Sequence, residues 1–201
     1  MKDLNIEPNE FLQHRVTAYY HGYHRRWDDT EVGFINTLKN DPGDFNNETK
    51  DFGFTLIGAQ KRLCEILKED LVEIANSTKN RLTICVIPRS KTNQSYKASQ
   101  LLFASTIKKF ALANGVLFDD GTGYITRVAD TPTTHITHDY ESIKIGISKK
   151  TCDISTDVSG RDILLIDDIY TKSVNIDEDF IQALYDKGAN SVIFYAIGST
   201  I

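Results

Sequence analysis

The segment D-I-L-L-I-D-D-I-Y-T-K-S-V-N, which runs from Asp162 to Asn175, is the strongest indication of the fold in this chain. An apolar run leads into two adjacent carboxylates, Asp167 and Asp168, and a short polar turn then precedes a predicted helix. Ligands of open α/β sheets bind beyond the carboxyl ends of the strands, and free amides at a helix start suit an anion. The pattern therefore predicts a sugar phosphate site, with the carboxylates on sugar hydroxyls or a metal and the turn on the phosphate.

The second half of the chain alternates between predicted strands and predicted helices. Runs rich in β-branched residues predict strands over 82–87, 143–147, 163–166 and 191–197, and helical spacing predicts helices over 98–113 and 176–187. Strand, loop and helix in succession form the unit of a parallel sheet. We therefore expect an α/β core over residues 81–201, with a mostly parallel sheet flanked by helices.

The first 80 residues carry mainly helical signals. Apolar and aromatic residues recur at nearly helical spacing over 10–23, and a second helix is predicted over 28–38. A cluster of turn formers over 40–53 predicts a loop or hairpin, and 56–74 is the clearest amphipathic helix of the chain. We expect residues 1–80 to form a mainly helical elaboration of the core.

Composition narrows the class of protein. A chain of 201 residues suits one domain with an elaboration, and a net charge of −5 without a concentrated basic patch argues against a nucleic-acid surface. The N-terminus is too polar for a signal peptide and no apolar run is long enough to cross a membrane, so a cytoplasmic location is expected. Cys64, Cys85 and Cys152 lack metal-site spacing, and Cys64 and Cys85 are expected to be small buried hydrophobes.

The acid pair and the turn after it resemble the signature of type I phosphoribosyltransferases, which use 5-phosphoribosyl 1-diphosphate (PRPP). In that family an apolar strand is followed by two acidic residues, two spacers and Thr-Thr-Gly-x-Thr. Here Asp167 and Asp168 are followed by Ile169 and Tyr170, and then by Thr171-Lys172-Ser173-Val174-Asn175. The frame matches, and of the four defining loop residues the first is kept. The resemblance covers about residues 81–201.

The resemblance implies a role for the acid pair and for the turn. Asp167 and Asp168 would contact the ribose hydroxyls of PRPP, directly or through Mg²⁺, and would meet the positive charge that develops on the sugar as pyrophosphate leaves. The turn would wrap the 5-phosphate through Thr171, Lys172, Ser173, Val174 and Asn175.

A second loop and a long polar segment complete the implied site. Ile87-Pro88-Arg89-Ser90-Lys91 resembles the competence-type branch of the family, and Arg89, Ser90, Lys91 and Thr92 would hold the pyrophosphate. Arg127, within the polar segment 116–141, would belong to a mobile hood that closes over PRPP. In such proteins the segments outside the core commonly recognise the acceptor base, so residues 1–80 are expected to do this, and homodimers are common.

Two departures from the family pattern leave alternatives open. Ser173 stands where the family has glycine, which tolerates positive φ. Asp177-Glu178-Asp179 either faces solvent and stabilises the helix dipole, or crowds the phosphate and weakens its binding.

The leading hypothesis is a PRPP-dependent phosphoribosyltransferase, a glycosyltransferase of nucleotide metabolism, that uses Mg²⁺ and an unidentified base. The rivals are a non-catalytic sensor of PRPP or a ribonucleotide with the same fold, and a hydrolase of a nucleotide or sugar phosphate.

Overall fold

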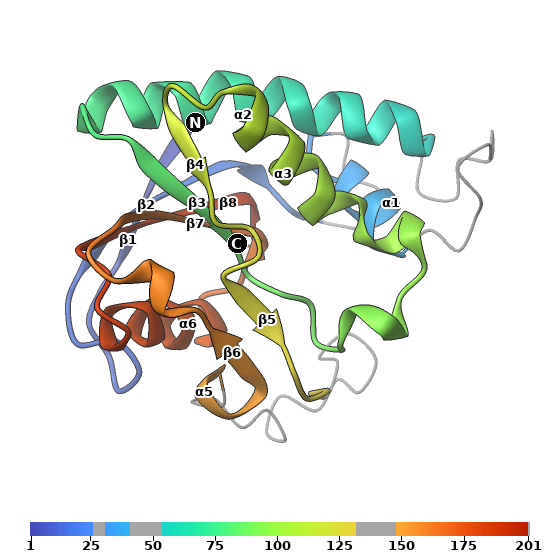
Figure 1. Ribbon diagram of the computed structural model, residues 1–201. Coiled ribbons are helices and arrows are strands. Elements are labelled where there is room, and N and C mark those ends of the chain that lie inside the picture. The colour runs from blue at the N-terminus through green and yellow to red at the C-terminus, as the bar shows by residue number, and fades with distance from the viewer. Residues whose placement is uncertain (26–30, 41–53, 132–147, 201) are drawn as a thin grey trace.

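The structure, a computed structural model, describes residues 1–25, 31–40, 54–131 and 148–200 (Figure 1). The strands are β1 (Lys2–Ile6), β2 (Val16–Tyr23), β3 (Leu82–Val86), β4 (Phe118–Asp120), β5 (Ile125–Arg127), β6 (Cys152–Ile154), β7 (Asp162–Tyr170) and β8 (Ser191–Ser199). The helices are α1 (Phe34–Asn40), α2 (Leu56–Thr78), α3 (Leu102–Ala113), α5 (Ser148–Thr151) and α6 (Ile176–Asp186), with 3₁₀ turns at Asn93–Ser95, Ala98–Leu101 and Thr156–Val158.

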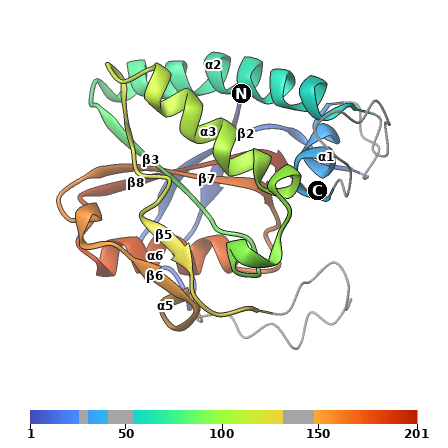
Figure 2. The ribbon, with the colours of Figure 1, turned by 45° about the vertical axis from the view of Figure 1, so that its right-hand side comes forward.

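A six-stranded sheet in the order β1-β2-β8-β7-β3-β4 forms the centre of the molecule. The strands from β2 to β4 in this order run parallel, and β1 pairs antiparallel with β2. Helices α1, α2 and α3 cover one face and α6 covers the other (Figures 1 and 2). A separate antiparallel pair, β5 and β6, lies beside the main sheet. The expected α/β fold with a mostly parallel sheet flanked by helices is confirmed.

The central elements form where the sequence predicts them. Every residue of β3 is buried, as are 163–166 of β7, because helices cover both faces of a parallel sheet. Helix α2 starts after Thr55, whose hydroxyl accepts a hydrogen bond from the Gly58 N–H at 3.1 Å. Helix α6 ends shortly before Gly188. The φ of Gly188 is 91°, a conformation that glycine adopts more readily than residues with a side chain. The predicted strand over 143–147 lies outside the described residues.

The helix predicted over 10–23 is wrong, because residues 16–23 form strand β2. Residues four apart lie on the same side of both a helix and a strand, so Val16 and Tyr20 fit either pattern. The burial of β2 alternates with a period of two, and the strand pairs with β8, which is more than 170 residues away. Residues 1–80 therefore contribute two strands to the main sheet as well as helices α1 and α2. They do not form the mainly helical elaboration that the sequence predicts. Residues 28–30, expected to cap a helix, and 41–53, within the expected loop, lie outside the described residues.

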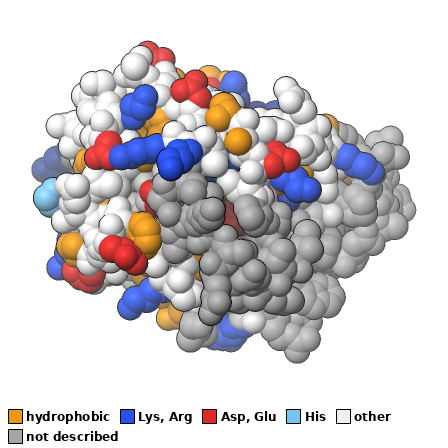
Figure 3. Space-filling model, turned by 90° about the horizontal axis from the view of Figure 1, so that it is seen from below, with side chains coloured by type: hydrophobic (Ala, Val, Ile, Leu, Met, Phe, Trp, Pro, Cys, Tyr) orange, Lys and Arg blue, Asp and Glu red, His pale blue; other side chains and the backbone are white. Residues whose placement is uncertain are grey.

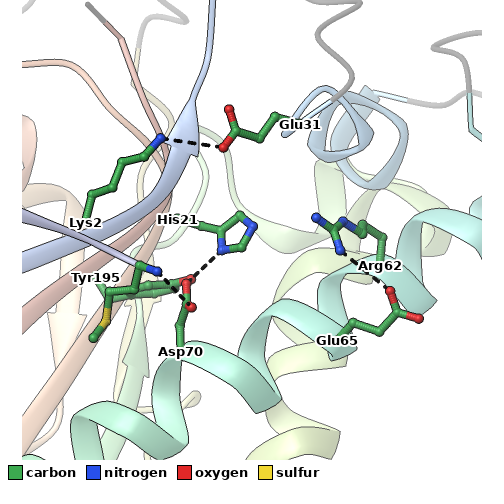
Figure 4. A network of polar contacts seen from close by, with 8 residues as sticks. Lys2, His21, Glu31, Arg62, Glu65, Asp70 and Tyr195 are labelled. Carbon is green, nitrogen blue, oxygen red and sulfur yellow. Dashed lines mark hydrogen bonds and ion pairs between the residues drawn. The ribbon is translucent and has the colours of Figure 1, made fainter.

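A buried polar network joins α2 to the sheet (Figure 4). Asp70 of α2 is 0% exposed, and its Oδ2 accepts hydrogen bonds from His21 Nδ1 at 2.9 Å and Tyr195 Oη at 2.7 Å. The terminal ammonium of Met1 lies 3.6 Å from Asp70 Oδ1. Burial raises the pKa of Asp70, but the hydrogen bonds from His21 and Tyr195 and the nearby positive charges outweigh it and hold the pKa below its usual value. One carboxylate thus ties α2 to the neighbouring strands β2 and β8.

The cysteines divide between the core and the surface. Cys85 and Cys152 are buried, whereas Cys64 is exposed. The prediction that Cys64 is buried is wrong, since it follows the buried Leu63 on α2 and turns toward solvent. Across the described ranges, none of the helices combines the length and apolar character that a membrane span requires.

Candidate functional site

Two loops leave neighbouring parallel strands where the order of the sheet reverses. After β3, the chain adds β4 on one side of it and later adds β7 on the other. Open α/β sheets bind ligands at such a reversal, beyond the carboxyl ends of the strands. The segments that follow β3 and β7 include 88–92 and 171–175, the two loops that the sequence predicts to hold pyrophosphate and phosphate.

The acid pair is divided between the two faces of the sheet. Strand β7 pairs with β8 as far as Tyr170 but with β3 only to Ile166. Asp167 and Asp168 therefore lie beside β8, past the end of the pairing with β3. Successive side chains of a strand point to opposite faces. Asp168 forms an ion pair with Lys39 of α1, whereas Asp167 hydrogen-bonds with Asp177 of α6. Adjacent acids in the sequence therefore do not form one chelating pair in space.

The start of α6 adds two buried acids to this cluster. Asp177 is 4% exposed and Glu178 is 3% exposed, so the alternative that they face solvent is wrong. Burial raises the pKa of Asp177 well above its usual value, and the neighbouring Asp167 raises it further. Burial likewise raises the pKa of Glu178, although the hydrogen bond from Tyr170 Oη at 2.9 Å opposes this.

The raised pKa values reduce the negative charge of the cluster. Burial, followed by the charge of Asp168, raises the pKa of Asp167 to about 7, although Lys39 pulls it down. Near pH 7, Asp167 is therefore partly protonated, and the pKa of Asp177 is shifted in the same direction. The repulsion that these acids exert on a bound phosphate is correspondingly smaller than that of fully ionised carboxylates.

The loop 171–175 is a turn that needs no glycine at position 173. The N–H of Val174 donates to the Thr171 carbonyl at 3.0 Å, and Lys172 and Ser173 are exposed. Among the described non-glycine residues positive φ occurs at Lys79 and Asn175, the latter with φ of 55°. The left-handed residue of the loop is thus Asn175, a residue type that tolerates this conformation. Ser173 causes no backbone strain there.

The loop after β3 is fixed by its own side chains. Arg89 Nη1 donates to the Gln100 carbonyl at 2.9 Å and also to the Lys39 carbonyl, and its guanidinium lies 4.0 Å from the centre of the Tyr96 ring. The Thr92 N–H donates to Asp130 Oδ1 at 2.8 Å. Arg89 Nη1 thus donates to two main-chain carbonyls and Nη2 lies 3.4 Å from Asn40 Oδ1, whereas the side chain of Lys91 is exposed. Ser90 hydroxyl lies 3.4 Å from the Tyr96 hydroxyl.

Arg127 lies beside this loop, with its guanidinium engaged. It is 9% exposed, and its Nε donates to the Arg89 carbonyl at 2.9 Å while Nη1 donates to Thr151 Oγ1 at 2.7 Å. A longer contact of 3.4 Å joins Nη2 to the Pro88 carbonyl. Arg127 thus joins the loop to α5. Residues 132–147 of the predicted hood lie outside the described residues.

The described residues do not form a metal centre. No group of three or more His, Cys, Asp or Glu side chains in the ranges given above is arranged to hold an ion. Asp167 and Asp168 face opposite sides of the sheet, so the pair does not fit one Mg²⁺ shared between them. A cavity of about 320 Å³ lies between β6 and α6 and contains none of the predicted site residues; Lys149, Cys152, Asp153, Ile154, Ala183, Asp186 and Lys187 line it.

Two residues that contact the predicted site carry no signal in the sequence. Lys39 pairs with Asp168, and Asn9 Nδ2 donates to Asn175 Oδ1 at 3.0 Å. Both belong to segments far from the acid motif along the chain, and packing alone brings them to it. The sequence indicates that Asp177 can repel a phosphate, but it does not indicate the contact of Asp177 with Asp167, because that contact depends on how α6 packs on the sheet.

The charges on the described part of the molecule are mixed. Figure 3 shows lysine and arginine side chains interspersed with acidic ones over the described part of the face seen from below. A nucleic-acid-binding surface has many basic side chains close together. The described part of this face does not have such a basic patch.

Comparison with known proteins does not assign the chain to a family. A scan against protein-family models finds no match, and a search of curated proteins finds none either. What the site binds is therefore inferred from its residues and their arrangement.

Proposed function

We propose that the chain binds a phosphorylated pentose, PRPP or a ribonucleotide, across the loops 88–92 and 171–175. The observation that carries this proposal is the position of the two loops, which follow the neighbouring strands β3 and β7 where the strand order reverses. Each loop offers hydroxyl groups and an exposed lysine, Lys91 in the first and Lys172 in the second. Ammonium and hydroxyl groups donate hydrogen bonds to phosphate oxygens, so the loops suit the two phosphorylated ends of PRPP.

We infer that the reaction of this site is the transfer of phosphoribose from PRPP to a nitrogen acceptor. The nitrogen forms a bond to C1 of the sugar while the bond from C1 to pyrophosphate breaks; pyrophosphate leaves with the electron pair, and the nitrogen releases its proton to water. The sugar gains positive charge as this happens, and a carboxylate stabilises it. Asp168 is proposed for this role because the side chain of Asp167 is engaged with that of Asp177. Mg²⁺ is proposed to arrive with the diphosphate of PRPP, as part of the substrate.

A second candidate, a non-catalytic sensor of PRPP or a ribonucleotide, is favoured by the state of the two arginines. Arg89 and Arg127 donate to main-chain carbonyls, and Arg127 is buried. Groups held in this way are not open to neutralise a departing pyrophosphate. A sensor would need the binding loops alone, and ligand binding would persist without turnover.

Calorimetry with PRPP and Mg²⁺ tests the binding proposal. We expect a Kd below about 1 mM, and we expect Lys172→Ala to weaken binding by more than about tenfold, as for one lost hydrogen bond to a charged group. Lys61→Ala is the matched control, because Lys61 is an exposed lysine on α2. No heat at millimolar PRPP, or equal losses in the two variants, would contradict the proposal.

Pyrophosphate release with a panel of purine and pyrimidine bases separates the two candidates. Release that depends on a base supports the transferase. Binding without release supports the sensor. Liberation of ribose phosphate without any base would instead indicate a hydrolase.

A further inference from the structure

The loop between β1 and β2 reaches across to the start of α6 (Figure 1). Asn9 Nδ2 donates to Asn175 Oδ1 at 3.0 Å, and the Gln13 N–H donates to Gln182 Oε1 at 3.0 Å. The loop therefore holds α6 at its N-cap residue and again at Gln182 within the helix. The two ends of each contact lie more than 160 residues apart in the sequence.

Asn9 is itself held in one orientation. Its Oδ1 accepts hydrogen bonds from the Phe11 N–H at 2.8 Å and the Leu12 N–H at 3.0 Å, and its own N–H donates to the Leu12 carbonyl at 2.9 Å. Leu12 is 0% exposed and belongs to the core, which anchors the turn. Because Oδ1 is occupied by the turn, Nδ2 is the end of the amide that faces Asn175.

Asn175 occupies the N-cap position of α6 without capping the helix. An asparagine at this position ordinarily accepts a hydrogen bond from an amide of the first turn. Here Asn175 has φ of 55° and makes no side-chain cap bond, since its Oδ1 accepts from Asn9. Within the described part of the chain, the N–H groups of Ile176 and Asp177 make no hydrogen bond. The contact with Asn9 thus leaves the first amides of α6 open beside the loop 171–175.

We propose that Asn9 is a positioning residue for the phosphate of the ligand, because it keeps the Asn175 side chain away from the first amides of α6. The inference rests on the proposed function, which assigns the loop 171–175 to that phosphate. Without Asn9, the Asn175 side chain would cap its own helix and compete with the phosphate for the same amides. The contact would also stop holding Asn175 in the left-handed conformation, which is less favourable for asparagine than for glycine.

The binding test uses ribose 5-phosphate and ribose as probes in calorimetry on three variants. Asn9→Ala is expected to weaken ribose 5-phosphate about fivefold, as for one lost hydrogen bond, and to leave ribose unchanged. Adding Asn175→Gly to Asn9→Ala is expected to restore the affinity to within about twofold, because glycine takes positive φ freely and has no side chain to cap the amides. Gln13→Ala is the control from the same loop, since Gln13 holds α6 through its main chain.

Unchanged ribose 5-phosphate affinity in Asn9→Ala would overturn the proposal. So would a double variant that stays as weak as Asn9→Ala, because a general loss of structure would not be repaired by glycine.

A measurement without ligand separates this inference from the proposed function. Amide hydrogen exchange in Asn9→Ala is expected to slow at Asp177, because the freed Asn175 side chain would then accept a hydrogen bond from this amide. A merely structural role for Asn9 predicts faster exchange, and unchanged or faster exchange would overturn the inference. If the wild-type protein binds neither sugar, the proposed function fails, and the exchange experiment still decides the role of Asn9.

Discussion

Replacing Tyr195 with phenylalanine removes one hydrogen bond from the buried network around Asp70 (Figure 4). The hydroxyl donates to Asp70 Oδ2 at 2.7 Å, and both residues are 0% exposed. The aromatic ring keeps its size, so the change creates no sizeable cavity. The variant therefore isolates the contribution of one buried donor to a carboxylate.

The expected loss follows from the partners that remain. A hydrogen bond to a charged group contributes about 1.5–3 kcal/mol to stability. His21 at 2.9 Å and the Met1 ammonium at 3.6 Å still contact Asp70 in the variant, so the carboxylate is not left unpaired. We therefore expect the free energy of unfolding to fall by about 2 kcal/mol, which lowers Tm by about 4–8 °C in a chain of this size.

Urea unfolding at pH 7, followed by circular dichroism, measures this loss. The midpoint should fall while the m-value stays the same, because the folded and unfolded surfaces are unchanged. Tyr19→Phe is the control, since Tyr19 is a partly buried tyrosine on β2 whose hydroxyl has no partner among the described residues. That variant should stay within about 0.5 kcal/mol of the wild type.

The pH dependence gives a second check on the same network. The pKa of Asp70 is held below its usual value, so its ionised form stabilises the fold above the unfolded-state pKa, and this stability is lost as the pH falls through the folded-state pKa. The difference between wild type and Tyr195→Phe should thus persist from neutral to mildly acidic pH. A difference at pH 7 no larger than that of the Tyr19 control would refute the reasoning, because the hydrogen bond would then merely offset the burial of the two groups.

Two further outcomes are expected. Since the pKa of Asp167 is raised to about 7, the folded protein holds a proton that the unfolded chain releases, and stability should fall as the pH rises from about 4 to about 7. Asp167→Asn should flatten this slope, with a gain on the order of 2–4 kcal/mol at pH 8 in urea unfolding; equal slopes in both proteins would count against a raised pKa. In a thiol titration with an aromatic disulfide reagent, Cys64 should react rapidly in the folded protein, while Cys85, whose pKa burial raises to about 12, and the buried Cys152 should react only after denaturation. More than one fast thiol would contradict the structure.

The elements predicted correctly are those whose signals are local. The apolar run of β7, the breaker Pro88 after β3 and Gly188 after α6 act within a few residues of the elements they limit. Strand β2 lacks such a signal, because its apolar positions fit both periods and its pairing with β8 decides between them. A single sequence without that pairing favours the helix that the tyrosine spacing indicates.

The candidate site shows the same division. The position of the acid motif at the carboxyl end of a strand could be predicted, because β7 is a local feature. Its geometry could not, since the expectation that both acids contact the same sugar or Mg²⁺ requires the strand to end before the acids, and β7 continues to Tyr170. The alternation of side chains then sends Asp167 toward α6 and Asp168 toward α1. The lengths of strands and the docking of helices set these contacts, and neither is encoded in the motif itself.

The two edge strands of the main sheet have a consequence for how the protein behaves at high concentration. A long, flat edge strand offers unpaired main-chain groups to another chain and promotes aggregation by extension of the sheet. Here β4 is three residues long, and β1 is five residues long and carries Lys2 and Asp3. A strand added at either edge would form few inter-strand hydrogen bonds, and along β1 it would also have to desolvate these charged side chains. The short and charged edge strands therefore disfavour extension of the sheet into fibrils.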